Sequence, residues 1–387
     1  MLYRTFPKIP DKSISVLGFG MMRLPLIQGK NRDDSAVDEK EAEKLVRIAY
    51  EQGVNYYDTA YIYHGGKSEE ILGRILRRLN IRNKVYIADK MPVWPVKEKA
   101  DWEKLFNTQL KRLGTDYIDF YLMHSLNDKS WQTIQKLNGL DFLEKMKKEG
   151  KIRHIGFSFH HEPETFRSII DGYENWEFCQ IQYNYLDEQY QAGTAGLKYA
   201  YDKGIGAVSM EPLRGGVLAR VPQAVTDIFA HANVPRLPAE WGLRWVWEHQ
   251  EITLALSGMG SAEQVLTNCA TASAAKPNSL PASQMRVIEK AAAWFKSRIK
   301  VPCTACAYCT PCPAGVSIPD IFSAYNAVSM QGAFENGGTK AFSTKYRSIQ
   351  DAQRGANKCV RCGACEPRCP QHIRIPDMLA QAHKAME

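Results

Sequence analysis

The first two thirds of the chain alternate between short apolar runs and stretches with helical periodicity. Eight runs rich in β-branched and aromatic residues are each followed by a segment in which apolar residues recur every three to four positions. Strands that alternate with helices predict a parallel sheet, and eight such units in about 250 residues are typical of a closed (β/α)8 barrel, the TIM barrel. An open doubly wound sheet is the alternative, but no G-x-G-x-x-G sequence opens a helix after the first run. The predicted strands are residues 15–20, 55–60, 85–90, 117–124, 152–158, 178–184, 206–211 and 253–258.

The length of 387 residues suits one large α/β domain and a smaller one. We expect the barrel over residues 1–276, a linker and connecting helix over 277–300, and a small, mainly helical domain over 301–387. The formal net charge is +8, but lysines and arginines are spread along the chain with matching acids, so we expect no nucleic-acid partner. No run of about 18 apolar residues is present, and we expect no membrane association.

Polar residues end three consecutive predicted strands, and in such barrels the chemistry lies at the carboxyl ends of the strands. Asp58 ends the second strand, with Tyr63 in the loop that follows; Lys90 ends the third and His124 the fourth. A nearby ammonium stabilises a phenolate, so Lys90, held charged by Asp58, is expected to lower the pKa of Tyr63. His124 is placed to hydrogen-bond a carbonyl oxygen. Each residue alone also has a structural explanation, as loop cap, packing aromatic, solvated lysine or core histidine; their joint placement favours catalysis.

These segments resemble a known family. The sequences NYYDTAYIYHGGKSEEILG, VYIADK, YIDFYLMHS and IRHIGFS are similar to signature segments of the aldo-keto reductases, and the resemblance covers about residues 13–275. It implies hydride transfer between a nicotinamide cofactor and a carbonyl, with Tyr63 as general acid, Lys90 and Asp58 as its tuning pair and His124 as the orienting residue. It also implies that Ser158 and Gln180 contact the nicotinamide amide, with Gly20 and Met21 nearby.

The sequence departs from the family pattern on the cofactor side. Phe159 follows the serine where Asn is common, and Met210 replaces the aromatic residue that usually stacks at the end of strand seven. Basic residues that commonly grip the 2′-phosphate of NADP are missing after strand eight. These departures predict weakened or altered NAD(P)H binding. The alternative is FMN at the same place, since barrels bind cofactor phosphates in the loops after strands seven and eight. The expected contacts in these loops are Met210, Leu213, Arg214, Gly216, Ser257, Gly258, Gln264 and Asn268.

Eight of the ten cysteines lie in two short runs near the C-terminus, each with its last cysteine before a proline. Thiolates spaced by two residues converge on one iron-sulfur cube, and the last cysteine before proline often reaches another cluster. The second run is similar to the C-x2-C-x2-C-x3-C-P run of bacterial dicluster ferredoxins, and the first is one residue shorter. The resemblance implies two 4Fe-4S clusters with pairing across the runs. One cluster takes Cys303, Cys306, Cys309 and Cys369, and the other takes Cys359, Cys362, Cys365 and Cys312.

Zinc and disulfides are the alternatives for these cysteines. A structural zinc site uses two separated pairs of ligands, whereas each run already holds four sulfurs. Disulfides need an oxidising compartment, but the N-terminal residues contain no apolar stretch of signal-peptide length, and we expect a reducing cytoplasm. Cys179 and Cys269 are expected to be core residues.

The two parts together predict an oxidoreductase that acts on a small carbonyl or alcohol. A nicotinamide transfers two electrons as hydride while a cube moves one at a time, so the clusters either feed the barrel through a converter such as a flavin or only stabilise the fold. A redox partner protein is a further expectation. Two other classes stay open: an electron-transfer protein whose barrel merely docks a partner, and a redox-sensing binding module. An intact group of acid, base and lysine argues against both.

Overall fold

The computed structural model describes residues 1–387 except 29–34, 304–308, 335–342 and 370. Its strands are β1 (Tyr3–Phe6), β2 (Ile9–Ser15), β3 (Leu17–Gly20), β4 (Tyr56–Asp58), β5 (Tyr86–Met91), β6 (Ile118–Leu126), β7 (Ile152–Phe159), β8 (Phe178–Gln182), β9 (Gly206–Met210) and β10 (Ile252–Ser257). The α-helices are α1 (Glu39–Glu51), α2 (Ser68–Arg78), α3 (Ala100–Leu113), α4 (Asp128–Lys136), α5 (Gly139–Lys148), α6 (Pro163–Asp171), α7 (Gly193–Asp202), α8 (Gln223–Ala230), α9 (Pro238–Glu248), α10 (Ala262–Ala272), α11 (Ala282–Lys296), α12 (Ile318–Met330), α14 (Thr344–Asp351) and α15 (Ile375–Met386). Short 3-10 helices are η1 (Met21–Arg23), η2 (Tyr63–Gly66), η3 (Arg82–Lys84), η4 (Arg214–Gly216) and η5 (Ala356–Lys358).

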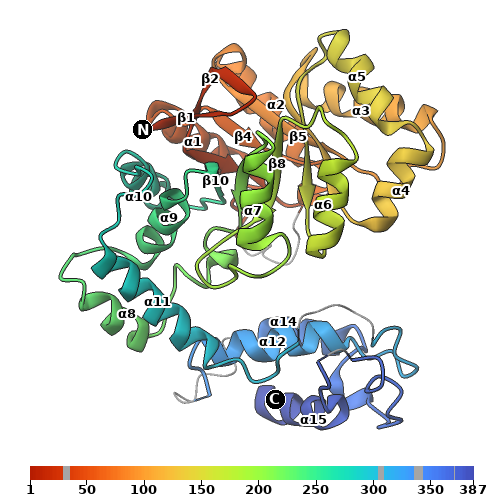
Figure 1. Cartoon of the computed structure of the whole chain (residues 1–387), viewed down its shortest axis with the longest axis vertical. Helices are drawn as coiled ribbons and strands as arrows, with labels where there is room; N and C mark the ends of the chain where they lie inside the picture. Colours follow the sequence, from red (N-terminus) through yellow and green to blue (C-terminus); the bar gives the residue numbers. More distant parts are fainter. Residues whose placement is uncertain (29–34, 304–308, 335–342, 370) are drawn as a thin grey trace. The chain divides into compact units, whose positions relative to one another are not determined.

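Strands β3 to β10 form a closed parallel barrel, as the alternating pattern predicts. Each strand pairs with the next along the chain, and β10 returns to pair with β3. Helices lie around the strands on the outside (Figure 1). The open doubly wound sheet is thereby excluded.

The interior of the barrel is filled by one residue from each of several strands, with Tyr56, Ala88, Phe120 and Phe178 among them. The β1–β2 hairpin adds Phe6, whose ring lies 5.5 Å from the rings of Phe120 and Phe178. Because side chains alternate with period two along a strand, the residue two positions beyond each of these points into the same interior, nearer the carboxyl end. Those next positions include Asp58, Lys90 and Gln180, so the strand period itself brings the predicted site residues together.

Local signals in the sequence set where several barrel helices begin and end. The Asp38 side chain accepts a hydrogen bond from Glu41 N at the start of α1, and Asn127 and Ser130 form a reciprocal capping box at the start of α4. Gly114, with φ +64°, ends α3 in the left-handed conformation that favours glycine. The caps at Asp38 and Asn127 fix where α1 and α4 begin, and so set the ends of the loops that follow β3 and β6 at the carboxyl ends of the strands.

The chain forms two compact units, one of Met1–Ala219 with Arg236–Met285 and the other of Arg220–Pro235 with Arg286–Glu387. In the second unit, α12 packs against α14 and α15 around buried residues that include Phe322, Tyr346 and Leu379. The described part of this unit is mainly helical, as expected for residues 301–387.

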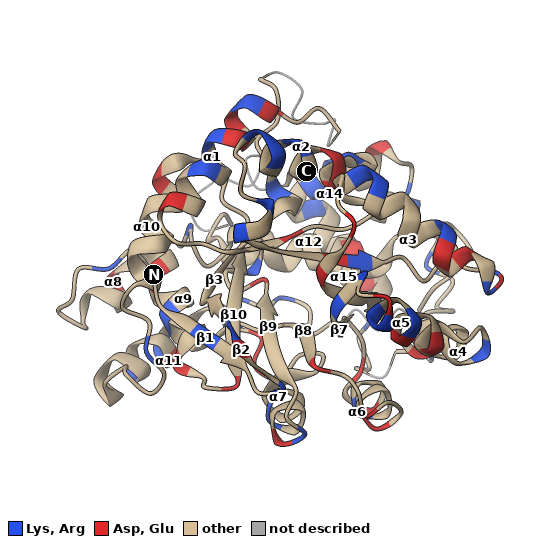
Figure 2. Ribbon diagram, turned by 90° about the horizontal axis from the view of Figure 1, so that it is seen from above, with Lys and Arg blue, Asp and Glu red and all other residues tan. Residues whose placement is uncertain are grey.

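Charged residues of both signs are interspersed on the outer helices, as Figure 2 shows for α1, α3 and α5. Within the described part of the chain, no helix is long and apolar enough to cross a membrane.

Candidate functional site

The four predicted catalytic residues meet at the carboxyl end of the barrel. Asp58 is the last residue of β4, Lys90 lies near the end of β5 and His124 near the end of β6. Tyr63 begins the 3-10 turn η2 in the loop after β4. Neighbouring strands therefore supply all four groups, as the sequence predicts.

Lys90 is the centre of this group. Its ammonium Nζ donates to Asp58 Oδ1 at 2.6 Å and to the main-chain oxygen of Thr59 at 2.7 Å, and it lies 3.5 Å from Tyr63 Oη. The Lys90 and Asp58 side chains are 1% and 4% exposed, so this ion pair is shielded from water. A buried charge persists when paired and hydrogen-bonded, and these contacts meet that requirement. The lysine thus holds a fixed positive charge beside the phenol.

Burial and charge act in opposite directions on these groups. Burial raises the pKa of the Tyr63 phenol above its ordinary value, and the Lys90 ammonium opposes only part of that rise. Burial alone would lower the pKa of Lys90, but the neighbouring acidic groups Asp58 and Tyr63 raise it above its ordinary value. Lys90 is therefore charged and Tyr63 protonated at neutral pH. The sequence-based expectation that the pKa of Tyr63 is lowered is therefore wrong for the net value. Lys90 does lower this pKa, but burial raises it by more.

His124 completes the group from the other side of Tyr63. The two rings meet edge to face with centroids 6.3 Å apart, and the Trp94 ring lies 5.4 Å from His124. Burial first, and then the charges of Lys90 and His160, lower the pKa of His124 to about 3. Nδ1 of His124 is buried without a hydrogen-bond partner among the described residues. A neutral imidazole at this position can orient a carbonyl oxygen without competing for the proton.

The lowered pKa of His124 predicts a pH-dependent contribution to stability. Between pH 6.5 and about 3 the unfolded chain binds a proton at this histidine and the folded chain does not, so stability falls as the pH falls. His124→Gln removes the titration, and we expect the stability advantage of the wild type over this variant to shrink by about 3 kcal/mol between pH 7 and pH 4. Denaturant unfolding of the barrel measures it; an unchanged difference would show that His124 already titrates normally.

The residues expected beside a nicotinamide lie on the next strands of the barrel. Ser158 Oγ accepts a hydrogen bond from Ser125 N at 2.7 Å, and Gln180 Nε2 lies 3.7 Å from Met210 Sδ. Gln180 Oε1 is buried and has no partner among the described residues. Met21 is fully buried just after Gly20, at the end of β3. An unpaired buried acceptor costs free energy, so Gln180 fits a site that a ligand N–H completes.

The loops after β9 and β10 carry the other expected cofactor contacts. Arg214 and Gly216 lie in the turn η4 and Leu213 directly precedes it; Arg214 Nε donates to Asp187 Oδ2 at 2.8 Å. After β10, Asn268 Nδ2 donates to Ser257 Oγ at 3.2 Å, and Gly260 N donates to Gln264 Oε1 at 2.9 Å. The side chains of Ser257, Gln264 and Asn268 therefore order their own loop and helix in this structure.

Sequence reasoning missed Arg23. Gly258 lies so close to Arg23 that a Cβ on the glycine would fall 2.7 Å from Arg23 Cβ. Arg23 and Arg214 also both act electrostatically on the Glu211 carboxyl, although burial keeps the pKa of Glu211 above its ordinary value. Arg23 therefore places a basic side chain beside the loop after β10, where the sequence lacks the basic residues that are common in the family. Its position directly after the first barrel strand was the available signal.

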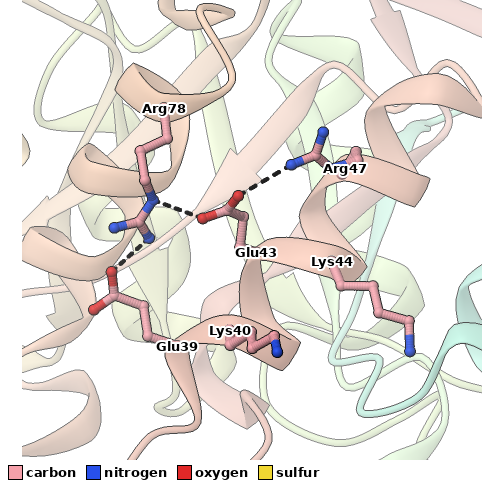
Figure 3. Close-up of a pocket in the computed structure, with 6 residues that line it drawn as sticks. All are labelled: Glu39, Lys40, Glu43, Lys44, Arg47 and Arg78. Carbon is pink, nitrogen blue, oxygen red and sulfur yellow. Dashed lines mark hydrogen bonds and ion pairs between the residues drawn. The ribbon is translucent and has the colours of Figure 1, made fainter.

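A hollow of about 490 Å³ lies elsewhere on the described surface. It lies on the outer side of α1 and α2 and is lined by Glu39, Lys40, Glu43, Lys44, Arg47 and Arg78. Figure 3 shows Arg78 between Glu39 and Glu43, at 2.5 and 2.6 Å, and Arg47 on Glu43 at 3.1 Å. These carboxylates are already paired, and the hollow contains none of the four catalytic candidates, so we assign it no role in the site.

The second cysteine run meets the last cysteine of the first run at one cavity. Cys359, Cys362, Cys365 and Cys312 line it together with the apolar residues Ile318 and Leu379. Cys303, Cys309 and Cys369 belong to or pack against the hydrophobic core of the same unit. Cys306 lies outside the described residues. Cys179 and Cys269 are buried in the barrel unit, as expected.

The donor set at this cavity suits an iron-sulfur cluster, since four thiols meet there inside an apolar wall. Across the described ranges, no three histidine, cysteine, aspartate or glutamate side chains lie close enough together to hold a single metal ion. The grouping of Cys312 with the second run is the one expected for pairing across the runs.

Fold and site together define a barrel oxidoreductase that carries a separate cysteine-rich unit. The chain belongs to the aldo/keto reductase family, whose model matches residues 16–293. A second model, for a 4Fe-4S dicluster domain, matches residues 302–373.

Relatives match the barrel part of the chain. Aldo-keto reductase AMT2 of Alternaria alternata is 29% identical over 234 residues, which cover 52% of this chain and 62% of that protein. L-galactose dehydrogenase of Arabidopsis thaliana is 28% identical over 280 residues, 66% of this chain and 84% of that protein. The holo form of aldo-keto reductase AKR11C1 from Bacillus halodurans superposes with a TM-score of 0.59 and 26% identity, over 75% of this chain and 96% of that one. The chain thus spans less than two thirds of the length of AMT2.

Proposed function

We propose that the barrel interconverts a small carbonyl compound and its alcohol by hydride transfer to and from a nicotinamide, with Tyr63 as general acid and base. The observation that carries this proposal is the placement of the Lys90 ammonium, 2.6 Å from Asp58 Oδ1 and 3.5 Å from Tyr63 Oη, in a water-shielded site. A merely structural ion pair has no need of a phenol and a neutral imidazole on its open side. Membership of the aldo/keto reductase family supports the same reaction class.

The residues act on the oxygen of the substrate. A nicotinamide, when bound, would supply the hydride for the carbonyl carbon. Tyr63 donates its proton to the carbonyl oxygen, and the Lys90 charge stabilises the phenolate that remains. His124, neutral because its pKa is about 3, hydrogen-bonds the same oxygen and orients it. In alcohol oxidation Tyr63 takes the proton back, so that direction is favoured at high pH.

The side chains expected around the nicotinamide fit its carboxamide. Gln180 Oε1 lacks a partner and can accept from the amide N–H group, while Ser158 Oγ lies on the adjacent strand. Arg23 and Arg214, which both approach Glu211, are the candidates for the phosphate groups. Gly20, Met21, Met210 and the loops after β9 and β10 complete the proposed groove.

We infer that the second unit holds two 4Fe-4S clusters with ligands exchanged between the cysteine runs. Support comes from the family match over residues 302–373 and from the cavity that Cys312 shares with Cys359, Cys362 and Cys365. Each cluster would carry one electron at a time, to a redox partner protein or within the chain, or would stabilise the fold alone. Such clusters fit a reducing cytoplasm.

A second candidate is a cluster-fed reductase in which a flavin occupies the groove. It is favoured by the mismatch between one-electron cubes and two-electron hydride, which a flavin converts. The residues that differ from the family pattern, such as Met210 beside Gln180, lie at the same place.

Cofactor analysis of protein purified without oxygen separates these candidates. We expect about eight irons and eight sulfides per chain, no released flavin, and saturable binding of NADH or NADPH. Bound FMN at one per chain would establish the second candidate instead. Zinc in place of iron would refute the redox assignment of the cysteines.

A further inference from the structure

A cluster of buried acidic and amide groups lies behind Lys90, on the side away from the substrate. Lys90 points into the barrel, so the preceding residue, Asp89, points outward to the layer of helices. There it meets Glu69 of α2 and Gln109 of α3, and all three side chains are fully buried. In a barrel this layer is normally apolar, and none of the proposed catalytic steps uses these groups.

The cluster holds the main chain of Lys90 at both its N–H and its C=O group. Lys90 N donates to Asp89 Oδ1 at 2.8 Å, and Lys90 O accepts from Gln109 Nε2 at 3.0 Å. Side chains therefore hold both polar main-chain groups of this residue. These two hydrogen bonds fix the position of the Lys90 main chain, from which its side chain extends into the barrel.

Hydrogen counting shows that one acidic group must be neutral. Gln109 Nε2 has two hydrogens but three acceptors within reach, namely Lys90 O, Glu69 Oε1 and Asp89 Oδ2, the last two both at 2.9 Å. The amide cannot be turned over, because its oxygen would then face those three acceptors, and Oε1 already accepts from Tyr121 Oη. A proton on one carboxyl group supplies the missing hydrogen, and the carboxyls of Asp89 and Glu69 are themselves in hydrogen-bond contact.

The charges around the pair identify which carboxyl keeps the proton. Arg112 Nη1 lies 2.8 Å from Glu69 Oε2 and compensates a single negative charge there. Among the described residues, Asp89 has no cation of its own in the helix layer, since Tyr121 of β6 and Gln109 of α3 are neutral and the Lys90 ammonium is engaged by Asp58. Burial, and then the Glu69 charge, raise the pKa of Asp89 well above its ordinary range.

We propose that Asp89 is a positioning residue: as a neutral carboxylic acid it shares one proton with Glu69 and holds the Lys90 main chain so that Nζ stays between Asp58 and Tyr63. This inference rests on the proposed role of Lys90 in catalysis. A neutral acid is required because a second buried anion so near Lys90 would stabilise the protonated phenol of Tyr63 and weaken it as an acid.

An infrared spectrum tests the protonation without any substrate. At neutral pH the wild type should show the carbonyl stretch of a neutral carboxylic acid, and Asp89→Asn should lose it. If the wild type lacks this band, or the variant retains it in full, the assignment of the proton to Asp89 is wrong. Neither outcome depends on whether the barrel is a reductase, so a failure of the proposed function is distinguishable from a failure of this inference.

Turnover of an aromatic aldehyde such as para-nitrobenzaldehyde tests the positioning. Asparagine keeps an acceptor for Lys90 N and a donor for Glu69, so Asp89→Asn should retain kcat within about threefold with an unchanged pH profile. Leucine has a similar branched shape but makes neither contact, so Asp89→Leu should lower kcat about 10- to 100-fold with little change in KM, and alcohol oxidation should need a higher pH.

Two results would overturn the proposal: a folded Asp89→Leu protein with wild-type kcat, or an Asp89→Asn protein as impaired as the leucine variant. If Asp89→Leu does not fold, Gln109→Met takes its place. It leaves Asp89 and Glu69 in place but removes the donor to Lys90 O, together with the contacts of Gln109 to the two carboxyls, and should lower kcat about tenfold. An unchanged kcat in a folded Gln109→Met protein would equally count against positioning through the main chain.

Discussion

Tyr63→Phe should lower kcat for carbonyl reduction by about 10²- to 10⁴-fold and leave KM within about threefold. The variant keeps the aromatic ring against His124 but removes the only proposed proton donor to the substrate oxygen. Because the lost interaction is made in the transition state, the effect should fall on kcat. Steady-state kinetics on protein purified without oxygen measure it.

Tyr61→Phe is the matched control in the same loop. The Arg112 guanidinium lies 4.3 Å from the centre of the Tyr61 ring, a contact that phenylalanine retains, so activity should stay within about twofold. Full activity in the Tyr63 variant would instead support a barrel that only docks a redox partner.

Paired cysteine substitutions should reveal how the two runs share their clusters. If ligands are exchanged, Cys312→Ala combined with Cys359→Ala removes two ligands from the same cluster, and about four irons should remain. Cys312→Ala combined with Cys303→Ala removes one ligand from each, and iron should fall close to zero. Iron and acid-labile sulfide per chain distinguish the two variants.

The reverse pattern would show that each run binds its own cluster. Cys179→Ala serves as the control, because this thiol is buried in β8, where burial raises its pKa to about 12 and keeps it protonated. Its substitution should leave the iron content unchanged, and a loss would indicate that the measurement reports folding and not ligation.

The barrel and the meeting of Asp58, Lys90 and His124 follow from rules that act along the chain. Strand period and the order of strand and helix segments are local properties, and a closed parallel barrel then brings consecutive strand ends together. The position of Tyr63 also follows, since it lies only five residues beyond Asp58 in the same loop. For these residues, the position in the sequence is enough to predict the position in the barrel.

What the sequence alone could not give depends on packing between segments far apart in the chain. The pKa of Tyr63 is raised although the pattern suggested a lowering, because the depth of its burial comes from several loops at once. The role of Asp89 could not be predicted, because its partners Glu69 and Gln109 come from two separate helices. Arg23 is likewise brought to Gly258 only by closure of the barrel between β10 and β3.

Deuterium transfer tests the central claim most directly. The holoprotein is given NADPH or NADH that carries deuterium at the transferable position, together with an aldehyde in ordinary water, and the alcohol product is analysed by mass spectrometry. Direct hydride transfer in the barrel predicts deuterium on the carbinol carbon of the product. With Tyr63→Phe, the amount of deuterated alcohol should fall in proportion to the lost turnover. An alcohol free of deuterium would contradict the account, because it would mean that the electrons reach the substrate through a carrier that exchanges its hydrogen with water.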